Sequence, residues 1–106
     1  MILISCRKGF TDSRAFAKQN AIRNYPFLPK LDQFEELDEA NLAQQVQGKH
    51  VLILVHGFRN PLANVAASYQ RLLKGLTDSG LVGAGGYDLV LGFTWPGFEK
   101  IGRAHV

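Results

Sequence analysis

The stretch VLILVHGFRNP, residues 51–61, decides the fold of this chain. It opens with five valine, leucine and isoleucine residues, which run into His56 and Gly57 and then into Asn60-Pro61. A short apolar run bounded by glycine and proline is typical of a strand that is buried on both faces in the parallel sheet of an α/β domain. The sequence therefore predicts a strand over residues 51–55, with the functional question at its carboxyl end.

The residues after this strand predict a helix. Asn60 is a suitable N-cap and Pro61 a suitable first helical residue, since the missing N–H of proline would be unpaired there anyway. Apolar residues then recur at steps of three and four: Leu62, Val65, Ala66, Tyr69, Leu72, Leu73 and Leu76. This spacing predicts a helix whose apolar stripe lies on the sheet and which ends near Ser79 and Gly80.

A second buried strand is predicted over residues 87–93, followed by Thr94-Trp95-Pro96-Gly97. Strand, helix and strand with these connections form a right-handed parallel βαβ unit. Because parallel strands end at one edge, where α/β sheets bind ligands, residues 56–60 and 94–97 are expected to be neighbours. The glycines at 83–86 follow a helix and precede a strand, the reverse of a phosphate loop, and are interpreted as a connection.

The amino-terminal half gives weaker patterns. Residues 2–6 predict a strand, and residues 11–22 predict a helix that Thr11, Asp12 or Ser13 would cap. Residues 25–29 contain two prolines, which indicate an extended connection or an edge strand.

Residues 34–47 show a weakly amphipathic helical pattern, which is firmest over residues 38–47. The acids in this segment could form a metal or acid–base cluster, but acids near a helix N-terminus also interact favourably with the helix dipole. The second interpretation is preferred for all four: Glu35, Glu36, Asp38 and Glu39.

Composition narrows the function classes. The 106 residues allow one domain, and 46% hydrophobic content is that of a globular protein. The net charge of +3 comes from scattered basic residues, so nucleic-acid binding is not expected. No apolar run is long enough for a signal or a membrane span, and Cys6 has no partner for a disulfide, so a cytoplasmic protein without membrane contact is expected. Cys6 itself is interpreted as a buried structural thiol.

The turn after the first strand could stabilise an oxyanion. Backbone N–H groups at the positive end of a following helix suit this task, with Phe58 as the principal donor and Gly57 allowing a tight turn. His56 would then orient the loop without transferring protons. An ordinary buried, hydrogen-bonded histidine at a strand end explains the same residues, and the turn alone does not decide between the two.

Residues 51–98 resemble the amino-terminal part of an α/β-hydrolase. They are most similar to an uncharacterised serine-hydrolase-like group with the pattern HGFNN, a helix and then FSWPS; here Arg59 replaces an asparagine, and Thr94 and Gly97 replace serines. The resemblance implies an α/β fold with a partial parallel sheet and flanking helices, and a serine hydrolase that acts on an ester, thioester or related acyl bond of a small molecule, without a cofactor or metal. It also implies an oxyanion hole formed by Phe58 and Gly57. The residues that would shape the site are His56, Arg59, Asn60 and Trp95.

In that family the nucleophile is a serine in a Gly-x-Ser-x-Gly elbow after the next strand, followed by an acid and a histidine. None of the serines here lies between glycines in such an elbow. Residues 1–99 are therefore expected to be the truncated amino-terminal part of one hydrolase domain, without the nucleophile strand and the carboxyl-terminal half. This part alone is expected to be inactive. Residues 100–106 are interpreted as a non-native tail, because Ile101 to Val106 can be encoded by the start of a common sequencing adapter.

Without the nucleophile strand, residues 51–55 would form an exposed sheet edge, which predicts self-association. The alternative from another class is a small non-catalytic α/β module that binds a protein partner through this edge.

Overall fold

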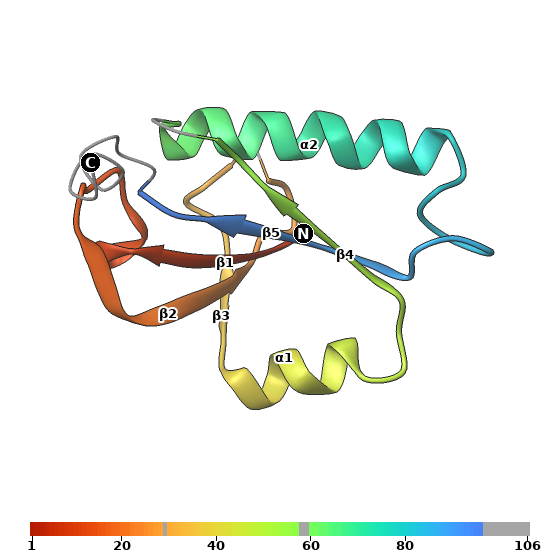
Figure 1. Cartoon of the computed structure of the whole chain (residues 1–106), viewed down its shortest axis with the longest axis horizontal. Coiled ribbons are helices and arrows are strands. Elements are labelled where there is room, and N and C mark those ends of the chain that lie inside the picture. The colour runs from red at the N-terminus through yellow and green to blue at the C-terminus, as the bar shows by residue number, and fades with distance from the viewer. Residues whose placement is uncertain (29, 58–59, 97–106) are drawn as a thin grey trace, which may run out of the picture.

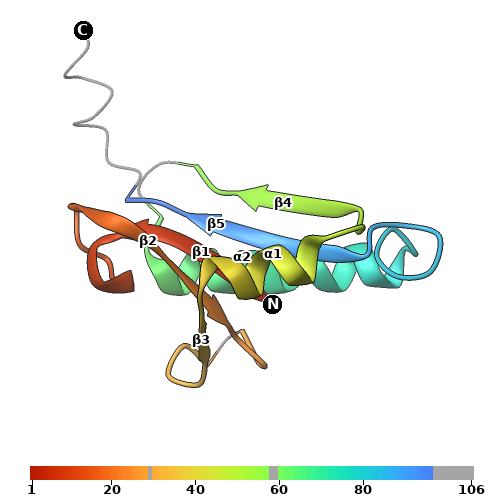
Figure 2. The ribbon, with the colours of Figure 1, turned by 90° about the horizontal axis from the view of Figure 1, so that it is seen from below.

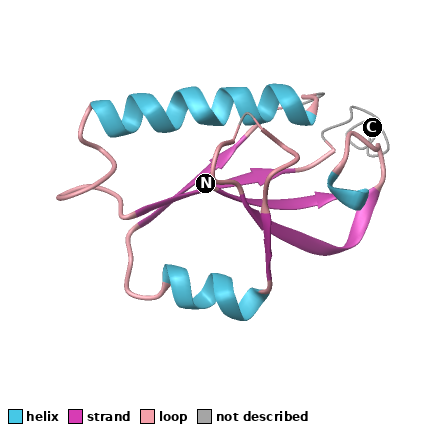
Figure 3. Ribbon diagram, turned by 180° about the vertical axis from the view of Figure 1, so that it is seen from behind, coloured by secondary structure: helices cyan, strands magenta, loops and turns pink. Residues whose placement is uncertain are grey.

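The computed structural model describes residues 1–28, 30–57 and 60–96. Within them the chain forms a five-stranded sheet with an α-helix on each face (Figure 1; Figure 3). The elements in chain order are β1 (Ile2–Arg7), the 3-10 helix η1 (Lys8–Phe10), β2 (Phe16–Asn24), β3 (Glu35–Leu37), α1 (Glu39–Val46), β4 (Val51–Val55), α2 (Leu62–Asp78) and β5 (Leu89–Thr94).

The sheet is mixed, with the strand order β3-β2-β1-β5-β4. β5 lies between β1 and β4 and is parallel to both, whereas β2 is antiparallel to β1 and β3 is antiparallel to β2. The α/β class and the parallel βαβ unit of β4, α2 and β5 are therefore confirmed. The expectation of a parallel sheet is correct for three of the strands that the structure describes.

The helix predicted over residues 11–22 is wrong, because most of this segment belongs to β2. Its alanine, lysine and glutamine residues favour a helix intrinsically, but such preferences are weak compared with tertiary pairing. Ile22 pairs with Ile4 on one side and with Leu37 on the other, so the strand is held between two neighbours.

The helix predicted over residues 34–47 is confirmed in its firmest part, as α1. Asp38 is the N-cap: its carboxylate accepts a hydrogen bond from the Asn41 N–H at 2.7 Å, and the Asn41 side chain accepts from the Asp38 N–H. Glu35 and Glu36 lie before this cap, in β3. The acid run thus divides between a strand and a capped helix start.

α2 starts and ends close to the predicted positions. Asn60 is not its N-cap, since that position is held by Pro61, whose side chain makes no capping hydrogen bond. At the other end Ser79 is the C-cap and Gly80 has a φ of 80°, the left-handed conformation that favours glycine. Across the described residues, neither helix has the length and apolar character to cross a bilayer.

Each face of the sheet carries its own core. The core between α2 and the sheet includes Val65 and Tyr69 of the helix and Leu3 of β1, while the face toward α1 buries Ile2, Ile22 and Leu91. The Tyr69 ring lies against the backbone of Gly92, and its hydroxyl donates to the Phe93 carbonyl at 2.6 Å. Burial raises the pKa of Tyr69 to about 12, so the hydroxyl remains a donor at neutral pH.

Replacing Gly92 with alanine should destabilise the fold. The new Cβ would lie 2.5 Å from Leu3 Cδ2 and 2.6 Å from the Tyr69 ring, and overpacking of this kind costs about 1–3 kcal/mol. Urea denaturation measures the loss. The matched control is Gly75→Ala on α2, which has open space around it and should gain about 0.5–1 kcal/mol. Equal stability of Gly92→Ala and the wild type would contradict the close contact.

Candidate functional site

The carboxyl ends of β1, β4 and β5 lie together beside the start of α2 (Figure 1). They bring Arg7, His56, Thr94 and Trp95 to one edge of the sheet. The expected proximity of the His-Gly turn to the end of the second strand is confirmed for His56, Thr94 and Trp95, which are hydrogen-bonded to one another.

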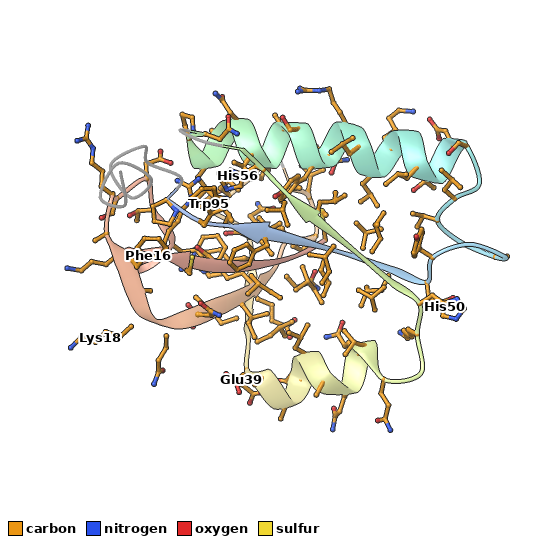
Figure 4. The ribbon with its side chains drawn as sticks, viewed as in Figure 1. Phe16, Lys18, Glu39, His50, His56 and Trp95 are labelled. Carbon is orange, nitrogen blue, oxygen red and sulfur yellow. The ribbon has the colours of Figure 1, made fainter. Side chains whose placement is uncertain are left out.

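Trp95 holds His56 through its backbone and its ring. The Trp95 backbone N–H donates to His56 Nε2 at 3.1 Å, and the indole N–H donates to the His56 carbonyl at 3.1 Å. The two rings are stacked, with centroids 5.8 Å apart and planes 19° apart. Figure 4 shows both side chains at the end of the sheet where α2 begins. This fixes the position and the orientation of the imidazole.

The hydrogen bonds of His56 assign its tautomer. Because Nε2 accepts from the Trp95 N–H, the neutral ring carries its proton on Nδ1, which lies 2.7 Å from the Gly57 carbonyl and donates to it. Thr94 Oγ1 lies 3.2 Å from Nε2, next to the single lone pair that accepts from the Trp95 N–H. Burial lowers the pKa of His56, the Arg7 charge lowers it further, and the Gly57 carbonyl opposes them. His56 is therefore a neutral ring with both nitrogens engaged, which suits positioning better than proton transfer.

Arg7 ties the strand ends together from inside the protein. The residue is 1% exposed, and its Nε donates to Thr94 Oγ1 at 2.7 Å. Its two other nitrogens donate to the Asn60 carbonyl at 2.5 Å and to Asp12 Oδ1 at 3.3 Å. A guanidinium without such partners would be costly to bury. No functional role is predicted for Arg7 from the sequence. The feature that could have indicated one is the position of a charged residue at the end of an apolar strand.

Asp12 performs the capping that the sequence assigned to Asn60. Its Oδ1 accepts from the Leu62 N–H at 2.5 Å as well as from Arg7. A carboxylate at this position satisfies a free N–H at the helix start and interacts favourably with the helix dipole. The Asn60 amide instead donates to the Gly57 carbonyl at 3.4 Å. The start of α2 is thus stabilised by a residue that lies 50 positions away in the chain.

The turn itself is described only in part. Phe58 and Arg59, predicted as oxyanion donor and site-shaping residue, lie outside the described residues, as does the interpreted tail at residues 100–106. Gly57 is exposed, its φ is not in the left-handed region, and a Cβ there would meet no heavy atom of the described residues within 4 Å. Its backbone conformation therefore does not require glycine, and the missing side chain leaves open space beside His56.

The nucleophilic side chains within the described ranges are engaged elsewhere. Each serine hydroxyl has a local hydrogen bond: Ser5 with the Arg7 N–H, Ser13 with the Ala15 N–H, Ser68 with Arg71 and Ser79 with the Leu76 carbonyl. Burial raises the pKa of the Cys6 thiol, although its own backbone and Arg7 oppose this, so the reactive thiolate is disfavoured. At the described strand ends His56 is therefore not paired with a serine or cysteine, and the hydroxyl beside it, that of Thr94, is buried and hydrogen-bonded to Arg7.

Two other features lie away from the strand ends. An open groove lies between β2 and the start of α1, with Lys18, Leu37 and Glu39 among its lining residues. In the part of the chain that the structure describes, no group of three or more histidine, cysteine or acidic residues is placed to hold a metal ion. Neither feature adds a functional group to the cluster around His56.

Comparison with known proteins gave no match among family models, curated proteins or solved structures.

Replacing Arg7 with methionine should destabilise the protein by about 1–3 kcal/mol. The methionine keeps much of the volume but leaves Thr94 Oγ1 and the Asn60 carbonyl without their donor, which costs this much for buried groups. Chemical denaturation measures the change. Arg71→Met on the exposed side of α2 is the control and should stay within about 0.5 kcal/mol of the wild type. Equal effects of the two substitutions would count against the buried network.

His56 should make the folded state less stable as the pH falls. The folded-state pKa lies below the ordinary value of 6.5, so the unfolded chain takes up the proton first. The contribution of neutral His56 to the stability of the folded state is complete at pH values above the ordinary pKa of 6.5. It is lost as the pH falls through the folded-state pKa. Denaturation midpoints across this range should fall in the wild type and fall less in His56→Gln.

The control for this titration is His50→Gln, since His50 is an exposed histidine before β4. Because it keeps His56, this variant should retain the fall in the denaturation midpoint that is assigned to His56. Parallel curves for the wild type and His56→Gln would show that His56 is not the group responsible.

Proposed function

We propose that this chain supplies the oxyanion side of an acyl-hydrolase site with the α/β-hydrolase type of sheet. The proposal is carried by one observation: the neutral His56, locked by Trp95, stands where three parallel strands end and α2 begins. In α/β sheets this edge is where ligands bind. The catalytic serine would come from chain beyond the described residues, since the described serines are engaged elsewhere.

The chemistry assigns different tasks to the residues of the turn. Asp12 already accepts the hydrogen bond of the Leu62 N–H, so the first turn of α2 is not free to bind an oxyanion through that group. The proposed donor is the backbone N–H of Phe58, with the open space at Gly57 admitting the substrate carbonyl. His56, Asn60 and Trp95 hold the backbone that leads to it, and Arg59 would line the entrance.

The substrate class is a small molecule with an ester, thioester or related acyl bond, because an oxyanion donor acts on the tetrahedral intermediate of acyl transfer. No nucleic acid or membrane takes part in this scheme. A single cysteine fits a reducing compartment, and the cytoplasm is the proposed location.

Reading the gene past Glu99 in an independently assembled genome provides the test. We expect a Gly-x-Ser-x-Gly elbow after the next strand, and ester hydrolysis by the protein expressed to its native stop codon. Replacing the elbow serine with alanine should lower kcat on the order of 10³-fold or more, and the 106-residue chain should be inactive. Hydrolysis that survives the serine replacement, or a frame without an elbow, would defeat the proposal.

The second candidate function is a non-catalytic module that binds a protein strand through β4. It is favoured by the exposure of Ile53 and Val55, which are 56% and 64% exposed at the sheet edge. A strand edge of this kind can take up an extended peptide by adding it to the sheet.

A further inference from the structure

The two edges of the sheet differ in how they are protected against pairing. β3 forms one edge with three residues, of which Glu35 and Glu36 are exposed, and Glu36 pairs with Arg23 at 3.8 Å. β4 forms the other edge with five apolar residues and an unbroken register to β5. Short length, charges, prolines and bulges are the devices that keep edges apart. β3 has two of these devices, whereas β4, as described, has none.

The apolar surface of the sheet continues onto β4 and ends there in solvent. Ile53 is paired with Leu91 and Val55 with Phe93, and Leu91 is buried at 4% exposure. α1 covers this face near Val51, which packs in the same core, but leaves Ile53 and Val55 exposed. Figure 2 shows β4 along the outer side of the sheet, beyond β5. An exposed apolar edge of this kind is a template for another strand.

We propose that this edge is occupied by a second copy of the chain, with the two β4 strands antiparallel about a two-fold axis at Ile53. The sequence Val51-Leu52-Ile53-Leu54-Val55 reads the same in both directions. An antiparallel pair centred on Ile53 therefore sets isoleucine against isoleucine, leucine against leucine and valine against valine. Such directly opposed β-branched and aliphatic pairs stabilise a sheet.

The backbone is compatible with this register. Alternate residues of a strand direct their N–H and C=O groups to the same side, so either Ile53 or the Leu52 and Leu54 pair faces away from β5. A two-fold axis at Ile53 places outward-facing residues opposite outward-facing residues in both cases. Because the contact is isologous, each copy uses the same β4 edge and the assembly closes as a dimer.

Charge and contact area set the strength of the dimer. β4 has no charged residue, so no like charges face each other across the axis, while each chain has a net charge of +3 that repels at longer range. Salt screens this repulsion, and dimerisation should strengthen as ionic strength rises. Stable specific interfaces bury about 1,200–2,000 Å² in total, and two five-residue strands lie at or below the low end of that range. The dimer should therefore exchange with monomer.

The dimer is argued from the exposed β4 edge alone and uses none of the acyl-hydrolase chemistry proposed above. A strand paired with β4 as in an α/β-hydrolase would compete with the second copy for the same edge. A partner protein is less favoured because the internal symmetry of β4 provides a matched register only with itself. The experiment below uses no hydrolysis assay, so its failure would leave the first proposal untouched.

Sedimentation velocity of the whole chain tests the interface. We expect a monomer–dimer equilibrium that shifts to dimer with protein concentration and with salt. Ile53→Lys, at a residue 56% exposed, should remain monomeric and keep the circular dichroism spectrum of the wild type. Leu81→Lys is the matched control: it makes the same kind of change at a site 53% exposed, outside the strands, and should dimerise like the wild type.

The proposal would be overturned by a wild type that stays monomeric or forms larger species, or by an Ile53→Lys variant that still dimerises.

Cysteine cross-linking in a Cys6→Ala background tests the register separately and does not depend on the lysine variant folding. Ile53→Cys faces its own copy at the axis and should form an intermolecular disulfide on mild oxidation, since directly opposed Cβ atoms approach the distance that a disulfide requires. Leu52→Cys faces Leu54 of the second copy and should not cross-link. Equal cross-linking of both variants would exclude the two-fold register.

Discussion

The rest of the structure depends on the parallel pairing of β5 with β1 on one side and β4 on the other. The register runs straight across the three strands, with Leu91 between Ile2 and Ile53 and Phe93 between Ile4 and Val55. Gly92 lies between these two rows. A Cβ at this position would point to the opposite face of the sheet, and its absence makes room for the Tyr69 ring of α2. The helix can therefore lie close to the sheet, and the three strands end at a common level.

This common level brings together polar groups that are far apart in the chain. Arg7 and Thr94 are separated by 87 positions, yet the guanidinium donates to the threonine hydroxyl inside the protein. The same hydroxyl lies next to His56, so the buried charge, the hydroxyl and the neutral imidazole form one connected network. Removing any member leaves another without its partner, because low-dielectric surroundings make unpaired polar groups costly. The arrangement favours a rigid scaffold behind the His-Gly turn.

The parts of the fold that are encoded by neighbouring residues can be predicted from the sequence. β4, α2, the glycine connection and β5 follow from an apolar run, a three-and-four spacing and turn residues, and the meeting of His56 with Thr94 and Trp95 follows from the geometry of parallel strands. β2 was missed because helix-forming residues were recruited into a sheet by neighbours on both sides.

The polar framework of the site could not be predicted in the same way. In the sequence Arg7 is a charged residue that follows an apolar run, and Asp12 is one of three candidates for the cap of a local helix. Their actual partners, Thr94 and the Leu62 N–H, lie 87 and 50 positions away and are set by the packing of α2 on the sheet. Asn60 has the residue type of a cap, but Asp12 takes that function through space.

His56 is a positioned hydrogen-bond acceptor where the strand ends meet. The protonation of its two ring nitrogens tests this role most directly. Nitrogen-15 NMR of the imidazole at neutral pH should show a proton on Nδ1 and none on Nε2, as the Trp95 N–H and Gly57 carbonyl require. A proton on Nε2, or a doubly protonated ring at neutral pH, would contradict the account and leave His56 available as an acid or base.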